Sequence, residues 1–80
     1  MGLDAADPLA GLKVYPNPTR GTLTIDAKDV ISVEVFDLAG RLVTTFEGVN
    51  SFDITGLAAG TYTLRIETAR GETVRRIVKK

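Results

Sequence analysis

Few residues of this 80-residue chain are of the types that carry out catalysis. The chain has no cysteine and no histidine, so the usual nucleophile–base pairs and the commonest transition-metal ligands are missing. Ser32 and Ser51 lie in strand-like patterns without a recognisable activating base. No pair of carboxylates is placed in a recognisable cleft. The sequence therefore indicates a protein that is not an enzyme and that uses no metal, cofactor or small-molecule substrate.

Three aspartates are candidate cation ligands. Asp26 and Asp29 flank a loop, but calcium takes six or more oxygens and no loop here has that ligand density. Asp37 opens the segment Asp-Leu-Ala-Gly-Arg, which is typical of a hairpin turn with Gly40 in a left-handed conformation. An aspartate at this place accepts hydrogen bonds from the N–H groups of its own loop. We expect Asp37 to stabilise the turn.

The formal net charge is zero, but the charges are unevenly distributed along the chain. Residues 1–64 carry four basic and eight acidic side chains, whereas residues 65–80 carry six basic and two acidic ones. A nucleic-acid-binding domain more often shows a broad basic surface, with aromatic platforms if it binds single strands. The sequence therefore does not indicate a nucleic acid as a partner.

The C-terminal segment is the strongest candidate for a recognition element. It consists of Arg75, Arg76, Ile77, Val78, Lys79 and Lys80. One interpretation is an edge strand whose lysines discourage edge-to-edge aggregation. The other is an exposed edge that adds as a strand to a receptor, with the charges steering the encounter. We favour recognition, and we expect both lysines to point outward.

Period-2 alternation predicts strands in seven short runs, separated by turn signals about every ten residues. The expected strands span 13–15, 22–26, 31–35, 42–46, 51–54, 61–68 and 72–79. We expect Ile31, Val33 and Val35 to share the buried face, with Phe36 on the opposite one. In the last run Val74, Arg76 and Val78 share one phase, which a bulge or an edge position would explain.

Two local motifs support a sandwich. Leu57-Ala58-Ala59-Gly60-Thr61-Tyr62 predicts a tyrosine corner, with the ring inside and the hydroxyl bonded to backbone upstream. In Pro16-Asn17-Pro18 the prolines remove two N–H donors, so the first strand cannot be central. We interpret that segment as a rigid entry that protects a sheet edge from unwanted pairing. The predicted fold is an all-β, immunoglobulin-like Greek-key sandwich of about seven antiparallel strands over residues 13–80, after a linker or cloning remnant at 1–12.

The order of these pieces resembles a type A C-terminal sorting domain of the type IX secretion system. The chain has a Tyr-Pro-Asn-Pro start, a Val-x-Val-Phe-Asp-Leu-Ala-Gly-Arg hairpin, a Leu-x-x-Gly-x-Tyr corner and a basic end. The matching residues are Tyr15, Pro16, Asn17, Pro18, Gly21, Asp37, Gly40, Leu57, Gly60, Tyr62, Leu64, Gly71 and Lys79-Lys80. Apart from the basic end, we expect these residues to have mainly structural roles.

This resemblance implies an address label for a cargo protein that is fused upstream. Such cargo crosses the inner membrane with its own signal peptide, and the translocon recognises the folded domain in the periplasm and carries the cargo through the outer membrane. A sortase-like cysteine peptidase then cuts upstream of the domain and attaches the cargo to the cell surface. Here the cut would fall in or before residues 1–12. Met1-Gly2 and the missing signal peptide are interpreted as signs of a fragment.

Two other functions fit a small β-sandwich. One is an extracellular carbohydrate-binding or adhesion accessory domain, and the other is a structural spacer. Sugar binding usually needs exposed aromatic platforms, and without tryptophan the candidates are Phe36 and Phe46.

Overall fold

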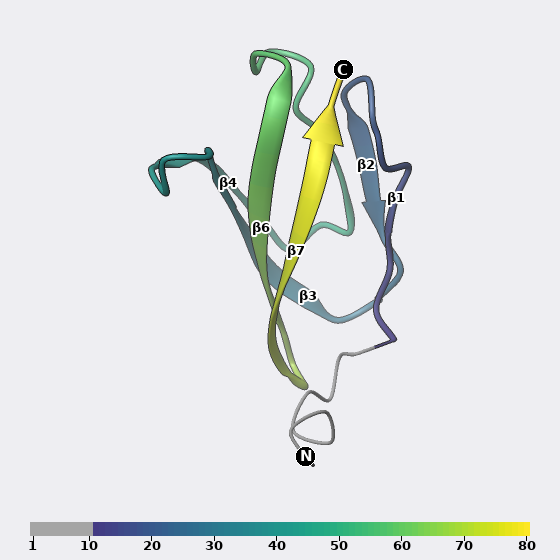
Figure 1. The fold of residues 1–80 in the computed structure, drawn as a ribbon. Helices are drawn as coiled ribbons and strands as arrows, with labels where there is room; N and C mark the ends of the chain where they lie inside the picture. Colours follow the sequence, from purple (N-terminus) through teal and green to yellow (C-terminus); the bar gives the residue numbers. More distant parts are fainter. Residues whose placement is uncertain (1–10) are drawn as a thin grey trace, which may run out of the picture.

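The computed structural model describes residues 11–80, which form seven strands in two sheets (Figure 1). The strands are β1 (Val14–Tyr15), β2 (Thr22–Ile25), β3 (Val30–Phe36), β4 (Leu42–Glu47), β5 (Ser51–Asp53), β6 (Gly60–Thr68) and β7 (Gly71–Lys79). No helix that is long and apolar enough to cross a membrane occurs in this part of the chain. Most of the predicted linker, residues 1–10, lies outside the described residues.

The two sheets have three and four strands, in the orders β1-β2-β5 and β4-β3-β6-β7. All strand pairs within the sheets are antiparallel. The chain changes sheet between β2 and β3, between β4 and β5, and again between β5 and β6. The predicted all-β sandwich with seven antiparallel strands is confirmed, and the immunoglobulin-like description is consistent with this arrangement. The short β1 is an edge strand, as its two following prolines require.

Alternating apolar residues from both sheets form the core. The largest fully buried apolar side chains are Leu23, Ile25, Val33, Val35, Leu64, Ile66 and Ile77. Burying a side chain of this kind contributes about 1.5–3 kcal/mol relative to exposure. Phe46 on β4 stacks against Phe52 on β5 with ring centroids 4.7 Å apart, which joins the two sheets. Phe46 is therefore partly buried against the core, and one face of its ring is covered by Phe52.

The expectation for Ile31 is wrong. Its side chain is about half exposed, whereas Val33 and Val35 are fully buried. The pairing of β3 with β6 shifts register between Val30 and Ser32, so the strict alternation that put Ile31 inside is interrupted there. Phe36 is absent from the hydrophobic residues that pack against the core, in agreement with its predicted place on the other face.

The last strand needs no bulge to explain its pattern. β7 pairs with β6 in unbroken register from Thr68 opposite Gly71 to Gly60 opposite Lys79. Only one of its sides is paired within the four-stranded sheet, because it lies at the end of the strand order. β7 is thus an edge strand without a bulge, and its alternation puts the exposed Val74 and Val78 on the outer face of the sheet.

The predicted tyrosine corner is confirmed. Tyr62 is buried, and its hydroxyl donates a hydrogen bond to the Ala58 carbonyl oxygen at 2.6 Å. The corner joins the loop after β5 to the start of β6, so it fixes how the chain returns from the small sheet to the large one.

Replacing Tyr62 by Phe removes this hydrogen bond and keeps the ring. The net loss is expected to be about 1 kcal/mol, which lowers the melting temperature by roughly 4–8 °C in a domain of this size. Thermal unfolding followed by circular dichroism measures the change. Tyr15→Phe is the matched control because the Tyr15 side chain is half exposed and its hydroxyl has no partner within residues 11–80. Equal melting temperatures for the two variants would contradict the structural role of the corner.

Candidate functional site

The alternation of β7 divides the six predicted recognition residues between two faces. Ile77 and Lys79 are buried and Arg75 is half-buried, whereas Arg76, Val78 and Lys80 are exposed. The Arg75 side chain donates hydrogen bonds to the Leu12 carbonyl oxygen at 3.3 Å and to the Val74 carbonyl oxygen at 2.9 Å. It thereby links the large sheet to the segment that precedes β1. The structure places three of the six side chains where a partner could contact them.

The expectation that both terminal lysines point outward is wrong for Lys79. Only 8% of this residue is exposed, whereas Lys80 is exposed. Lys79 follows Ile77 by two residues in an unbroken strand, so its side chain starts on the same face. The apolar stem of a lysine can be buried while its ammonium group finds polar partners. Here Nζ lies 3.5 Å from the Lys80 carbonyl oxygen.

The outer edge of β7 is not free over its C-terminal half, which corrects the prediction of an exposed edge there. A strap formed by residues 16–19 runs along it, and Figure 1 shows the C-terminus beside the loop that leads into β2. The amide group of the Asn17 side chain pairs with β7 as the backbone of a neighbouring strand would. Its Oδ1 accepts a hydrogen bond from Val78 N–H at 2.9 Å, and its Nδ2 donates one to the Arg76 carbonyl oxygen at 3.3 Å. Both X-Pro bonds of the strap are cis.

Thr19 completes the strap through its backbone. Its N–H donates to the Val78 carbonyl oxygen and its carbonyl accepts from Lys80 N–H, both at 2.8 Å. The buried Thr19 hydroxyl also donates to the Thr22 carbonyl oxygen at 2.6 Å and accepts from Gly21 N–H at 3.0 Å. Because the strap occupies these backbone groups, a receptor strand could pair with this part of β7 only by displacing it.

The role of Thr19 was not predicted from the sequence. The local signal is a threonine two residues before a glycine, which is typical of a turn closed by a hydroxyl-to-backbone hydrogen bond. Gly21 is needed at this turn for space, because a Cβ there would overlap the Thr55 hydroxyl. The Gly21 carbonyl also accepts a hydrogen bond from Ile54 N–H at 2.7 Å.

The prediction that Asp37 stabilises its turn is confirmed. Oδ1 accepts hydrogen bonds from Ala39 N–H at 3.0 Å and from Arg41 N–H at 2.9 Å, and Oδ2 pairs with Arg41 Nε at 3.2 Å. The Arg41 backbone N–H, followed by the Arg41 charge, holds the pKa of Asp37 below its ordinary value of 3.8. Gly40 has φ of 85°, the left-handed conformation that the turn requires.

Two further aspartates are held by neighbouring side chains. Asp29 pairs with Arg70 at 2.9 and 3.2 Å, and the hydrogen bond from Arg70 lowers the pKa of Asp29. The hydrogen bonds from Thr55, and then the Lys79 charge, lower the pKa of Asp53. Within residues 11–80 no three Asp, Glu, His or Cys residues group in a way that could hold a metal ion.

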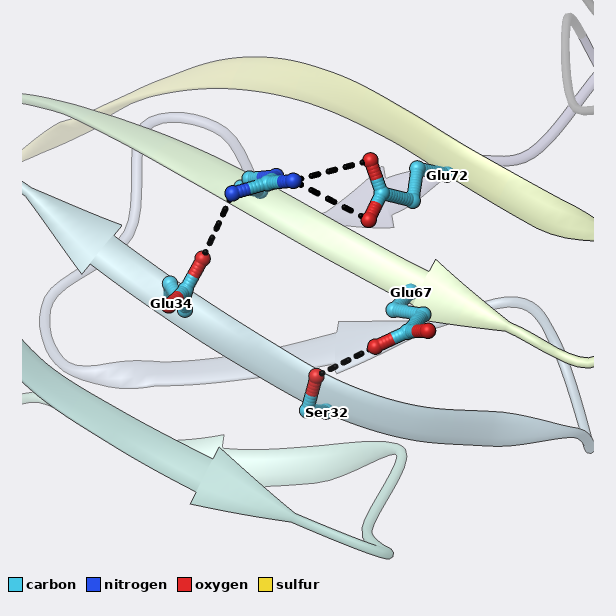
Figure 2. A network of polar contacts seen from close by, with 5 residues as sticks. Ser32, Glu34, Glu67 and Glu72 are labelled. Carbon is cyan, nitrogen blue, oxygen red and sulfur yellow. Dashed lines mark hydrogen bonds and ion pairs between the residues drawn. The ribbon is translucent and has the colours of Figure 1, made fainter.

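The outer face of the large sheet carries a polar network (Figure 2). Arg65 Nη1 contacts Glu34 Oε1 at 3.3 Å, and Arg65 Nη2 contacts both oxygens of Glu72 at 3.0 and 3.1 Å. The Ser32 hydroxyl donates to Glu67 at 3.4 Å. The Glu72 hydrogen bond, with the charges of Glu72 and Glu34, raises the pKa of Arg65 above its ordinary value. These side chains form hydrogen bonds and ion pairs with one another on an exposed sheet surface.

The fold and its strapped C-terminal strand define a small β-sandwich domain whose last residues are part of its own sheet. The chain belongs to the family of secretion system C-terminal sorting domains, whose model matches residues 13–80. It is also 33% identical over 69 residues to β-agarase D of Zobellia galactanivorans. That match covers 85% of this chain but 14% of the agarase. The domain is a C-terminal signal of type IX secretion, and such a tail directs an attached protein to the cell surface or the medium.

The strap can be tested by replacing Asn17 with Ala. This variant loses two hydrogen bonds to the edge of β7, so the free energy of unfolding should fall by about 1 kcal/mol and the melting temperature by roughly 4–8 °C. Asn50→Ala is the control, because the Asn50 side chain is exposed and makes no hydrogen bond within residues 11–80. If both variants have the same melting temperature as the unchanged protein, the strap does not stabilise the fold.

Acid should weaken the Asp37 turn. Folding lowers the pKa of Asp37, so on acidification the unfolded chain takes up the proton first. The stability that this carboxylate provides is complete above its unfolded value of 3.8 and is lost as the pH falls through the lower folded value.

Asp37→Asn removes this dependence while keeping a side-chain oxygen for the turn. The difference in melting temperature between the unchanged protein and the variant should therefore shrink between pH 7 and about pH 2.5. Asp26→Asn is the control, because the Asp26 carboxylate accepts no hydrogen bond within the described residues. A difference that stays constant down to the lowest pH would show that the Asp37 charge does not contribute.

Proposed function

We propose that residues 13–80 are recognised by the type IX translocon in the periplasm, which then carries an N-terminally fused cargo across the outer membrane. A sortase-like cysteine peptidase cuts upstream of the domain and attaches the cargo to the cell surface. The observation that carries this proposal is the family match over residues 13–80, in a domain that folds around its own C-terminal strand. The cargo and its activity belong to the part of the protein upstream of the domain.

The proposed domain acts without catalysis. Cysteine and histidine are absent from the chain, and Ser32 donates its hydroxyl hydrogen to Glu67 on an exposed sheet surface. Three of the arginines, Arg41, Arg65 and Arg70, form ion pairs with carboxylates that hold turns and strands together. These groups support a role in folding and recognition.

Recognition is assigned to the segment from Arg75 to Lys80, with different tasks for its two faces. The inward side chains, Arg75, Ile77 and Lys79, hold β7 to the rest of the sandwich. The outward side chains, Arg76, Val78 and Lys80, are exposed and combine positive charge with an apolar group. The charges would attract an acidic receptor, and contact at the face needs no displacement of the strap.

A reporter fusion tests this function. The 80-residue chain is fused behind a fluorescent protein that carries an N-terminal signal peptide, in a bacterium that possesses the type IX system. The reporter should appear at the cell surface or in the medium, whereas the same reporter without the domain should stay in the periplasm. Periplasmic retention of the fusion would contradict the proposal and favour the spacer or the sugar-binding accessory domain.

A further inference from the structure

Cross-strand register brings together, at one end of the outer face of the large sheet, three exposed side chains that are apolar or basic and three half-buried ones. Phe36 on β3 lies opposite Leu42 on β4 and Thr63 on β6, and Thr63 lies opposite Arg76 on β7. In the next row Thr61 lies opposite Val78. We call this set the apolar–basic half; it consists of Phe36, Leu42, Thr61, Thr63, Arg76 and Val78. Leu42 and Val78 are 48% and 41% exposed.

The other end of the same face is acidic. Ser32 lies opposite Glu47 and Glu67, Glu67 lies opposite Glu72, and in the next row Glu34 lies opposite Arg65. This end therefore holds four glutamates and one arginine, Arg65, which pairs with Glu34 and Glu72, and Figure 2 shows part of this network. Arg65 pairs with only two of the four carboxylates, so this half keeps a net negative charge.

The one basic residue of the apolar–basic half, Arg76, differs from Arg65 in its ion pairing. Arg76 and the neighbouring Lys80 form no ion pair within residues 11–80, in contrast to Arg65 at the acidic end. Because the strap closes the backbone edge beside them, these residues can meet a partner only through their side chains. Val78 and Leu42 lie outside the core, so their apolar side chains do not contribute to its packing.

We propose that the apolar–basic half binds an acidic and partly apolar surface of a protein of the export machinery. This inference rests on the proposed function and names the surface through which it acts. Leu42 and Val78 would supply apolar contact area, while Arg76 and Lys80 face carboxylates of the partner. The acidic half would repel the same partner, so the polarity of the face fixes the orientation of the docked domain.

A matched pair of substitutions in the reporter fusion tests this surface. Val78→Glu and Val74→Glu introduce the same side chain on the same strand and the same outer face, at positions that are 41% and 57% exposed. Val78→Glu should reduce the exported reporter by about tenfold or more, because it places a like charge against an acidic partner. Val74→Glu should leave export within about twofold, because it lies in the acidic half.

One measurement and one further variant separate this effect from a folding defect. The melting temperatures of both variants show whether the domain is intact, and Arg76→Glu provides a second substitution in the apolar–basic half that leaves the apolar side chains in place. If Val78→Glu unfolds the domain, loss of export by a folded Arg76→Glu variant would still support binding through the apolar–basic half. Export of the folded Val78→Glu and Arg76→Glu variants at the level of Val74→Glu would overturn the inference.

The remaining outcomes are also decisive. Retention of the unchanged fusion would refute the proposed function itself, which is a different result from equal export of the matched variants. A lipid surface is tested by co-sedimentation of the purified chain with vesicles of phosphatidylethanolamine and phosphatidylglycerol. Binding that Val78→Glu abolishes and Val74→Glu preserves would overturn the assignment of a protein partner in favour of an anionic membrane.

Discussion

The domain depends on the closure of one sheet edge by a segment from the opposite end of the chain. β7 is the last strand of the four-stranded sheet, and a bare edge there would offer its backbone groups to any other strand. The strap occupies those groups with hydrogen bonds from Asn17 and Thr19. Since the strap connects β1 to β2, the same contacts hold the small sheet against the large one.

Because of this closure, the basic C-terminal end is a structural part of the domain. Its backbone and half of its side chains belong to the fold, so loss of these residues would remove structural contacts together with any recognition surface. What a partner can contact is the outer face, where Arg76 and Val78 lie in register with residues of β6. The sheet thus has one edge closed by the strap and one polarised face that carries the exposed charges.

Local features could be predicted from the sequence because their partners lie within one turn. Tyr62 bonds to Ala58, four residues upstream, and Asp37 bonds within its own hairpin. The partner of Asn17 lies 61 residues away, and no local pattern indicates which strand edge an isolated asparagine will meet. Alternation gives no sign of the register shift that leaves Ile31 exposed, and the charge of Lys79 conceals that its phase in the strand is the inward phase of Ile77. The neighbours that β3, β4 and β6 place beside the C-terminal segment follow from the strand order, which the sequence does not indicate.

The strap is tested most directly by hydrogen-bond scalar couplings in the isotope-labelled 80-residue chain. An experiment that transfers magnetisation across hydrogen bonds should give correlations between Lys80 N and the Thr19 carbonyl carbon, and between Thr19 N and the Val78 carbonyl carbon. The β6–β7 ladder provides the internal reference. Both strap correlations should appear at intensities comparable to those of the ladder. Their absence, with the ladder correlations present, would mean that the edge of β7 is open and would contradict the account.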